Sequence, residues 1–310
     1  MDRLRAFGRR HRTPITILGS IATVVVLVYL LAGRRDEFAD ALTKAPLGLL
    51  AVAALGQIVA LLARSEAWHL TIEAAGGTVD RRVLYRASSM QVLGGMINGQ
   101  MGVAARIAAL RRSSPDVCPQ VPALVAAEFP IIAVEAVMAA LASYTLVGPL
   151  GLPWWLPLVG LAVVGAASAG LRHLAMRKGR ELWQGLAVLR SLNHGSRVVA
   201  FVLVAVIAQI ARTWLVLDAV GVSASVFDAI AVLIAVSTLM QLPVGPGVGA
   251  AAAVLILGSN GVAAAAAAGL LLTVTGTAGG LCFAAWAGGD RVWLAARQAT
   301  VRRARARAPG

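Results

Sequence analysis

The chain has 310 residues, of which 59% are hydrophobic and 14% are charged, and its mean hydropathy is +0.79. This composition excludes an ordinary soluble domain and is typical of an all-α polytopic membrane protein. The net charge of +14 comes almost wholly from arginine. These arginines lie beside apolar stretches, where membrane orientation and anionic lipid explain them better than nucleic acid does.

Apolar stretches of membrane-spanning length predict about six helices. The first follows a basic N-terminus and is 19 residues long at residues 15–33, so we interpret it as a retained span rather than a cleaved signal peptide. The predicted spans are residues 15–32, 46–63, 121–147, 154–171, 198–220 and 262–288.

Two further apolar segments, residues 84–110 and 226–257, are interrupted by Gly, Pro, Asn and Gln. Non-helical backbone at membrane depth is tolerated only where it is buried in protein or lines a cavity. Two such breaks at matching places in the two halves of a chain are typical of a transport site. The residues that we assign to the tips of these segments are Gly99, Gly102, Pro243, Pro246, Gly247 and Gly249.

Charge predicts how these segments enter the membrane. The basic stretches at residues 1–14, 172–197 and 290–310 are expected in the cytoplasm. If residues 84–110 crossed the membrane once, every later loop would contradict this rule, so the segment is expected to enter and return on the cytoplasmic side. The same reasoning makes residues 226–257 a hairpin from the outer face. We therefore predict two re-entrant helical hairpins in an inverted repeat.

This topology divides the chain into six parts. They are a basic cytoplasmic N-terminus (1–14), a first span with an outer loop (15–45), repeat 1 (46–147), a linking helix with a basic cytoplasmic loop (148–197), repeat 2 (198–289) and a basic cytoplasmic tail (290–310). The expected location is a bacterial cytoplasmic (inner) membrane with both termini in the cytoplasm. The expected partners are anionic headgroups of the inner leaflet, and an enzyme of envelope-lipid metabolism is a further candidate.

Charged residues inside the spans are the candidates for function, because a charge in lipid is costly unless it is paired or hydrated. Glu128 and Glu135 share a helix face, and Gln209 lies three residues before Arg212. Two interpretations stay open: a structural pair such as Glu135 with Arg212, or a polar cavity that binds a headgroup or relays protons. Glu128 lies nearer the cytoplasm, where hydration is an alternative. The predicted substrate-binding residues are Gln100, Arg106, Glu128, Glu135, Gln209, Arg212 and Gln241.

No motif in the sequence indicates catalysis. Cys118 and Cys282 lack metal-ligand spacing, the four histidines share no pattern, and no Walker loop, GxSxG or HExxH motif occurs. We therefore expect no metal, no cofactor and no enzymatic activity.

Three short motifs carry a family resemblance. Residues 98–106 (Asn-Gly-Gln-Met-Gly-Val-Ala-Ala-Arg), the pair Ala127-Glu128 and residues 242–249 (Leu-Pro-Val-Gly-Pro-Gly-Val-Gly) resemble the lysylphosphatidylglycerol synthase transmembrane-region family. The resemblance covers roughly residues 47–289 and implies a flippase-like integral membrane protein. The chain departs from the family pattern where Gln100 replaces an Arg, Val103 replaces a Glu, Phe129 replaces the Arg after Glu128, and Ala250 to Ala252 supply no Glu.

The resemblance implies a lipid flippase that moves an anionic or polyprenyl-linked lipid across the membrane. Lysyl transfer is not expected, because the sequence contains no synthase domain. A non-transporting scaffold or lipid-binding subunit is the main alternative. An integral membrane enzyme that acts on lipid-linked substrates, and a transporter of small solutes or ions, are two further alternatives.

Overall fold

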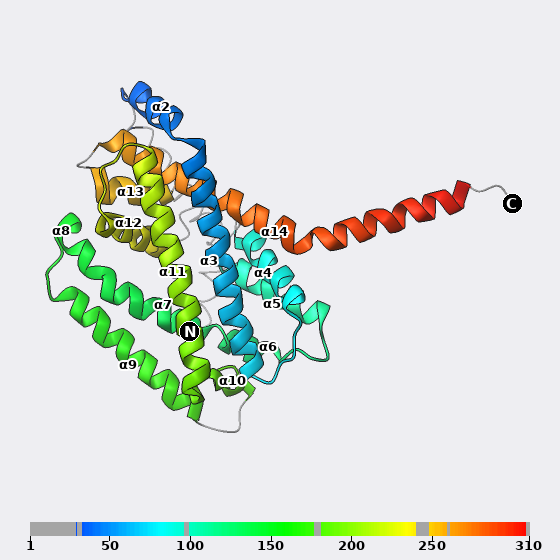
Figure 1. Cartoon of the computed structure of the whole chain (residues 1–310). Helices are drawn as coiled ribbons and strands as arrows, with labels where there is room; N and C mark the ends of the chain where they lie inside the picture. Colours follow the sequence, from blue (N-terminus) through cyan, green and yellow to red (C-terminus); the bar gives the residue numbers. More distant parts are fainter. Residues whose placement is uncertain are drawn as a thin grey trace, which may run out of the picture.

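A computed structural model of the chain describes residues 29, 33–95, 99–176, 181–239, 248–258 and 261–307 (Figure 1). Within these ranges the regular structure is entirely helical. In chain order, the helices are α2 (Arg35–Lys44), α3 (Leu47–Ala74), α4 (Arg81–Gly95), α5 (Gly99–Ser113), α6 (Val121–Ala126), α7 (Phe129–Ala142), η1 (Ser143–Leu146), α8 (Val147–Leu150), α9 (Leu156–Met176), α10 (Glu181–Gln184), η2 (Ala187–Arg190), α11 (Leu192–Ala219), α12 (Val226–Leu239), α13 (Val248–Leu257) and α14 (Val262–Arg307).

Five helical segments in the described residues are long and apolar enough to cross a membrane. They are α3, the α6–α8 run (Val121–Leu150), α9, α11 and the first part of α14 (Val262–Gly289). The predicted all-α polytopic membrane fold is therefore confirmed. The predicted first span, residues 15–32, lies outside the described residues except for Tyr29 and has no structural account here.

Helices α3 and α11 lie side by side and run in opposite directions through the bundle (Figure 1). Small residues form their contact: a Cβ on Gly56 would lie 3.4 Å from the carbonyl oxygen of Ala208, and Ala60 and Ala63 pack on Ala205. Such residues let two helix backbones approach closely. Close packing favours the association of helices in a membrane, where the hydrophobic effect does not drive it. This pair forms the axis on which the other helices pack.

The first interrupted segment forms two 15-residue helices, α4 and α5, that pack on each other. Near the connection between them, a Cβ on Gly102 would lie only 2.7 Å from the carbonyl oxygen of Gln91. At the other end, Thr78 donates a backbone hydrogen bond to Val117 (3.1 Å) beyond the C-terminal end of α3. The segment is therefore a helical hairpin whose two ends lie together.

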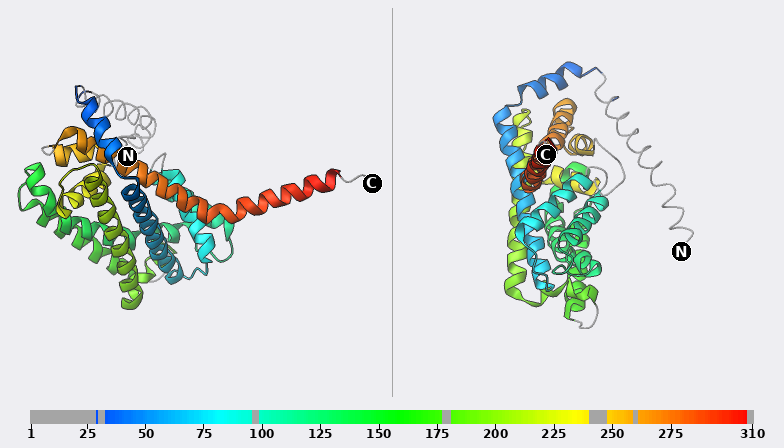
Figure 2. Two further views of the ribbon diagram at one scale, coloured as in Figure 1. Left: turned by 45° about the horizontal axis from the view of Figure 1, so that its top comes forward. Right: turned by 90° about the vertical axis from the view of Figure 1, so that its right-hand side faces the viewer.

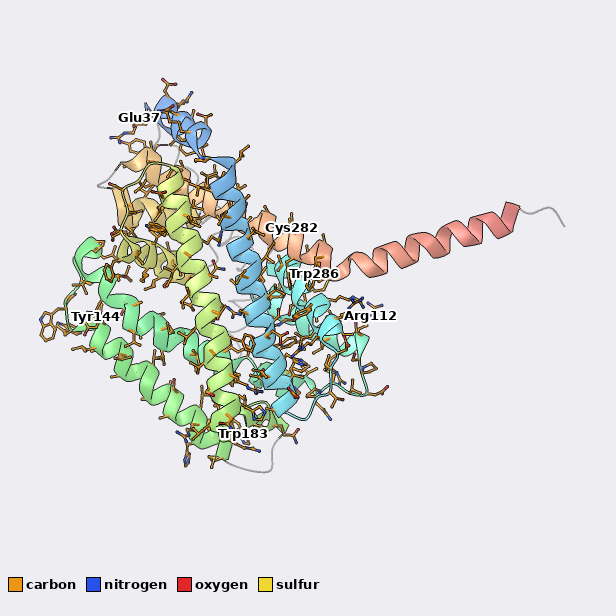
Figure 3. All side chains as sticks on the ribbon, viewed as in Figure 1. Glu37, Arg112, Tyr144, Trp183, Cys282 and Trp286 are labelled. Carbon is orange, nitrogen blue, oxygen red and sulfur yellow. The ribbon has the colours of Figure 1, made fainter. Side chains whose placement is uncertain are left out.

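The second interrupted segment contains α12 and α13, which contact each other and are only 14 and 10 residues long. Neither helix reaches across roughly 30 Å of hydrocarbon. Val222 and Leu257, at the two ends of this segment, share a hydrophobic cluster with Ala45, which precedes α3. The two segments thus open at opposite ends of α3. Glu37 and Trp183 mark these ends in Figure 3.

The spans predicted at residues 121–147 and 262–288 correspond to the apolar segments Val121–Leu150 and Val262–Gly289, but the structure adds detail in three places. The helix predicted over residues 121–147 is interrupted at Ala127 and Glu128, because Pro130 has no backbone N–H and its ring clashes with the carbonyl of the residue four positions earlier. The loop predicted before α3 contains α2, whose Asp40 pairs with Lys44 at 2.5 Å. Helix α14 continues beyond the predicted end at residue 288, because the Ala-rich and Arg-rich tail favours helix, and it projects from the bundle (Figure 2).

Glycines let α14 contact several neighbours at close range. A Cβ on Gly269 would lie 2.3 Å from Cα of Ala250 in α13. A Cβ on Gly279 would lie 2.6 Å from the carbonyl oxygen of Ala54 in α3. Because these contacts are to backbone atoms, a larger residue cannot be accommodated by a side-chain rotation.

We predict that Gly269→Ala lowers the free energy of unfolding by about 1–3 kcal/mol, because the added methyl group separates α13 from α14. Thermal unfolding of the purified chain in detergent measures this change. Gly165→Ala on α9 is the matched control, because its Cβ meets open space. Equal melting temperatures for the two variants would contradict the packing described for Gly269.

Candidate functional site

One face of α3 carries the polar residues that organise the interior. Gln57, Arg64 and Trp68 are separated by seven and four residues, so their side chains lie on the same side of the helix. At 1.5 Å of rise per residue they extend over about 16 Å of the helix. Each of the three is part of a different polar cluster, and the clusters bring in residues from α5, α7, α11 and α14.

The first cluster lies at the level of Trp68 and pairs Arg106 of α5 with Glu128 at the α6–α7 interruption. The Arg106 guanidinium carbon lies 3.8 Å from the centroid of the Trp68 ring, an arrangement that adds a cation–π attraction. Arg106 is 1% exposed and Glu128 is 4% exposed. Two buried charges persist only when they compensate each other, so this pair is a fixed element of the interior.

The second cluster is an ion pair between Arg64 of α3 and Glu135 of α7, with 2.6 Å between Nη1 and Oε1. The side chains are 34% and 29% exposed, so water reaches this pair, whereas the Arg106–Glu128 pair is buried. Partial hydration lowers the free energy that is needed to separate such a pair. Of the two ion pairs, this one is the easier to open.

The third cluster, which we call the Arg212 cluster, contains Gln57 of α3, Gln209 and Arg212 of α11, and Thr275 of α14. Arg212 Nη1 donates to the Oε1 atoms of Gln57 and Gln209, each at 2.9 Å. Gln209 Nε2 also donates to Gln57 Oε1 at 2.9 Å. Arg212 Nη2 donates to the carbonyl of Leu272 and lies 3.5 Å from Thr275 Oγ1. Among the described residues, the groups that accept hydrogen bonds from this cation are all neutral.

Helix α14 closes the Arg212 cluster through Gly276. A Cβ at this position would lie 2.6 Å from Nη2 of Arg212, so any other residue would displace the guanidinium. Arg212 itself is 9% exposed, whereas Gln57 and Gln209 are half-buried. The charge of Arg212 therefore lies inside the bundle, whereas the amides of Gln57 and Gln209 are partly exposed.

Five predicted substrate-binding residues lie in these clusters: Arg106, Glu128, Glu135, Gln209 and Arg212. The suggested pair of Glu135 with Arg212 is wrong, because Glu135 binds Arg64 and Arg212 binds amides. The suggested hydration of Glu128 is also wrong, because this carboxylate is buried against Arg106.

The predicted tip residues are described only in part. Gly99 begins α5, Gly102 packs on α4, and a Cβ on Gly249 would lie 2.8 Å from the carbonyl oxygen of Gly269. The side chain of Gln100 and all of Gln241, Pro243, Pro246 and Gly247 lie outside the described part of the chain.

The sequence prediction missed Gln57, Arg64, Trp68, Thr275 and Gly276. A signal for the first three was present, because intervals of seven and four place one amide, one guanidinium and one indole on a single face of an apolar helix. Arg64 was overlooked because the predicted helix ended at residue 63, whereas α3 continues to Ala74. Thr275 and Gly276 carry no local signal, since their role depends on how α14 packs.

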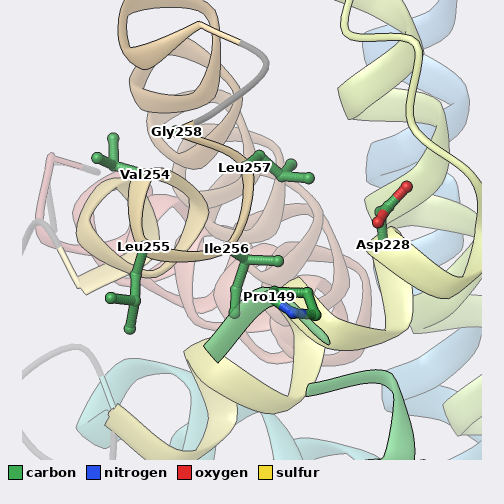
Figure 4. A pocket seen from close by; sticks show the side chains of 7 residues that line it. All are labelled: Pro149, Asp228, Val254, Leu255, Ile256, Leu257 and Gly258. Atoms are coloured by element: carbon green, nitrogen blue, oxygen red, sulfur yellow. The ribbon is translucent and has the colours of Figure 1, made fainter. Parts of the chain in front are cut away.

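A pocket of about 340 Å³ lies away from these clusters, between α8, α12 and α13 (Figure 4). The residues that line it include Pro149, Leu255 and Asp228. The Asp228 carboxylate already accepts hydrogen bonds from the backbone N–H and the hydroxyl of Ser225, as a helix cap does. No group of side chains suited to a metal ion occurs among the described residues.

We predict that Arg106→Ala lowers the free energy of unfolding by about 3–5 kcal/mol, because Glu128 is left as a buried charge without a partner. The Arg106→Ala/Glu128→Ala double variant should recover part of this loss. Thermal unfolding in detergent measures both, with Arg172→Ala at an exposed position of α9 as the control. A double variant no more stable than Arg106→Ala would refute the pairing.

The comparisons with known proteins bear on the whole bundle. No curated protein and no solved structure matches this chain. The model of the lysylphosphatidylglycerol synthase TM region matches residues 17–285, which include every residue of the three clusters. Because this match covers most of the 310 residues, the chain belongs to the lysylphosphatidylglycerol synthase TM region family.

Proposed function

We propose that this membrane protein moves an amphipathic lipid between the two leaflets, with the headgroup following the polar face of α3 and the tails remaining in the bilayer. One observation carries the proposal: three polar clusters, each with an arginine, lie along one face of a membrane-spanning helix. Membership of a membrane family named for a lipid synthase supports the same class of substrate.

A charged headgroup crosses hydrocarbon slowly because it loses its hydration there. Along α3 the clusters follow one another at steps of about 10 Å and about 6 Å, computed from seven and four residues of helical rise. Steps of this size let a headgroup begin new polar contacts before it has lost the previous ones. The partly exposed Arg64–Glu135 pair is proposed as the element that opens during passage.

The two hairpins are proposed to form an inverted repeat that encloses this path in a bacterial cytoplasmic membrane. The opening of α4–α5 and of α12–α13 at opposite ends of α3 supports the repeat. The predicted residues Gln100 and Gln241 are proposed to line the path near the two tips. The proposal requires transport without covalent chemistry, and the basic loops are proposed to bind anionic headgroups of the inner leaflet.

Reconstitution into vesicles tests this function. Vesicles that contain a trace of fluorescent phosphatidylglycerol are treated with dithionite, which bleaches the outer leaflet alone. We predict that vesicles with the wild-type protein lose the fluorescence of their inner-leaflet lipid faster than protein-free vesicles do, because lipid that reaches the outer leaflet is bleached by dithionite. Arg64→Gln/Glu135→Gln, which removes both charges of the middle pair, should slow this by about tenfold, the effect of about 1.4 kcal/mol on a barrier.

Arg172→Gln is the matched control, because it removes one positive charge from an exposed position of α9 outside the clusters. Vesicles with this variant should lose fluorescence at the same rate as vesicles with the wild type. If wild-type vesicles bleach no faster than protein-free vesicles, lipid transport is rejected in favour of a scaffold or a lipid-binding subunit. If the double variant keeps the full rate, the α3 face is not the path.

A further inference from the structure

We infer that the Arg212 cluster binds the phosphate of an anionic phospholipid, and that Arg212 is its counter-ion. This inference rests on the proposed function and deepens it by naming the substrate class. It also separates the arginines by role: Arg212 receives the ligand, whereas Arg106 is held by Glu128 and Trp68.

The distribution of charge in the bundle singles out Arg212. Arg106 has Glu128 as its partner, and Arg64 has Glu135. In the part of the chain that the structure describes, no carboxylate lies within 4.0 Å of Arg212. Both interrupted connections, residues 96–98 and 240–247, contain no Asp or Glu that might supply one.

A cation in this position is destabilising without an anion. Asp218, on the same helix, is exposed and six residues further on, which places it on a different face of α11. Amides and carbonyls orient dipoles toward the guanidinium, but they leave its full charge uncompensated in a low-dielectric interior. A bound anion removes this cost.

The cluster also offers donors that an anion requires. Gln57 Oε1 accepts from both Arg212 and Gln209, so the Nε2 group of Gln57 points away from the guanidinium, and no described residue accepts from it. Arg212 Nε is buried and likewise lacks an acceptor within the described ranges, as do the Nε atoms of Arg64 and Arg106. Charge-assisted hydrogen bonds from such groups match phosphate oxygens well.

The surroundings of the cluster favour a lipid as the source of the phosphate. Leu55 on α3 is 58% exposed and lies two residues before Gln57, and Ile207 on α11 is 60% exposed and lies two residues before Gln209, so both side chains lie on other sides of their helices than the amides. With the exposed Val59 and Val204 they give α3 and α11 apolar outer surfaces. Acyl chains are suited to these surfaces, and the two amides are themselves only half-buried, so a headgroup can reach them.

The same charge distribution argues against a ligand that carries an additional cationic group. Both carboxylates in the clusters, Glu128 and Glu135, are already occupied by arginines. A cationic headgroup would have to displace one of these arginines and would add to the positive charge of Arg212. We therefore assign anionic phospholipids without a cationic group as the substrate class, and phosphatidylglycerol is the probe of this class.

The test is lipid-dependent thermal stabilisation of the full chain in detergent. Short-chain phosphatidylglycerol should raise the melting temperature of the wild type. A short-chain phosphatidylcholine and a cationic lipid of equal chain length should act at concentrations about tenfold higher or not at all. Arg212→Gln should abolish the preference for phosphatidylglycerol, whereas Arg172→Gln, with the same loss of charge at an exposed site, should keep it.

A second measurement separates a binding role from a structural one. Without lipid, Arg212→Gln should melt close to the wild type, because the hydrogen bonds that Arg212 donates to Gln57, Gln209 and the carbonyl of Leu272 are lost, but the cost of a buried cation without a carboxylate is removed. A ligand-free variant that melts well below the wild type would identify Arg212 as a structural residue and would overturn the inference. Retained preference for phosphatidylglycerol in the variant would overturn it as well.

Inorganic phosphate is the remaining ligand in the thermal-stabilisation experiment. Stabilisation by inorganic phosphate as strong as that by the lipid would assign the cluster to a soluble anion and reject the lipid assignment. The test of the proposed function is independent of this binding experiment, because transport is measured by the rate of fluorescence loss in vesicles. A chain that accelerates bleaching without any dependence on Arg212 would keep the transport function and lose this site.

Discussion

The burial of arginine in an apolar bundle is the constraint on which the rest of this structure depends. A cation that leaves water for a low-dielectric interior costs several kcal/mol unless the protein supplies compensating groups. The three arginines along one face of α3 have different partners. Arg106 has a buried carboxylate and an indole ring, Arg64 has a partly exposed carboxylate, and Arg212 has neutral dipoles. The different partners give three arginines of the same intrinsic chemistry different roles.

Local features of the backbone bring these side chains into contact. The interruption between α6 and α7, which Pro130 enforces, places Glu128 at the end of a short helix where it meets Arg106. Gly276 removes the side chain that would otherwise occupy the position of the Arg212 guanidinium. Close packing through small residues, as at Gly56 between α3 and α11, brings the helices near enough for side chains on different helices to bind. Packing and polar chemistry are therefore coupled in this bundle.

The hydrophobic clusters divide α3 into two halves. One half packs with α12, α13 and the start of α14, and the other packs with α4, α5 and α6. The polar clusters lie on the same helix, so both hairpins pack on the helix that carries the proposed path. The family is named for a lysyl-lipid synthase, yet this chain has already engaged both carboxylates of the clusters. The proposed preference for an anion therefore rests on side-chain pairing and not on the fold.

Much of the fold was predictable from the sequence, because membrane spans follow from local hydropathy and interruptions of apolar segments follow from local Gly and Pro content. The sequence by itself determined the spans at α3, α9, α11 and α14 and the two interrupted segments, and it singled out Arg106, Glu128 and Arg212 as charged residues within apolar stretches. Only the tertiary structure decided which charges meet. Glu135 pairs with Arg64 and not with Arg212, because pairing depends on the rotation and the antiparallel register of helices that are far apart in the chain. For the same reason, the neutral surroundings of Arg212 became visible only when α3, α11 and α14 were seen packed together.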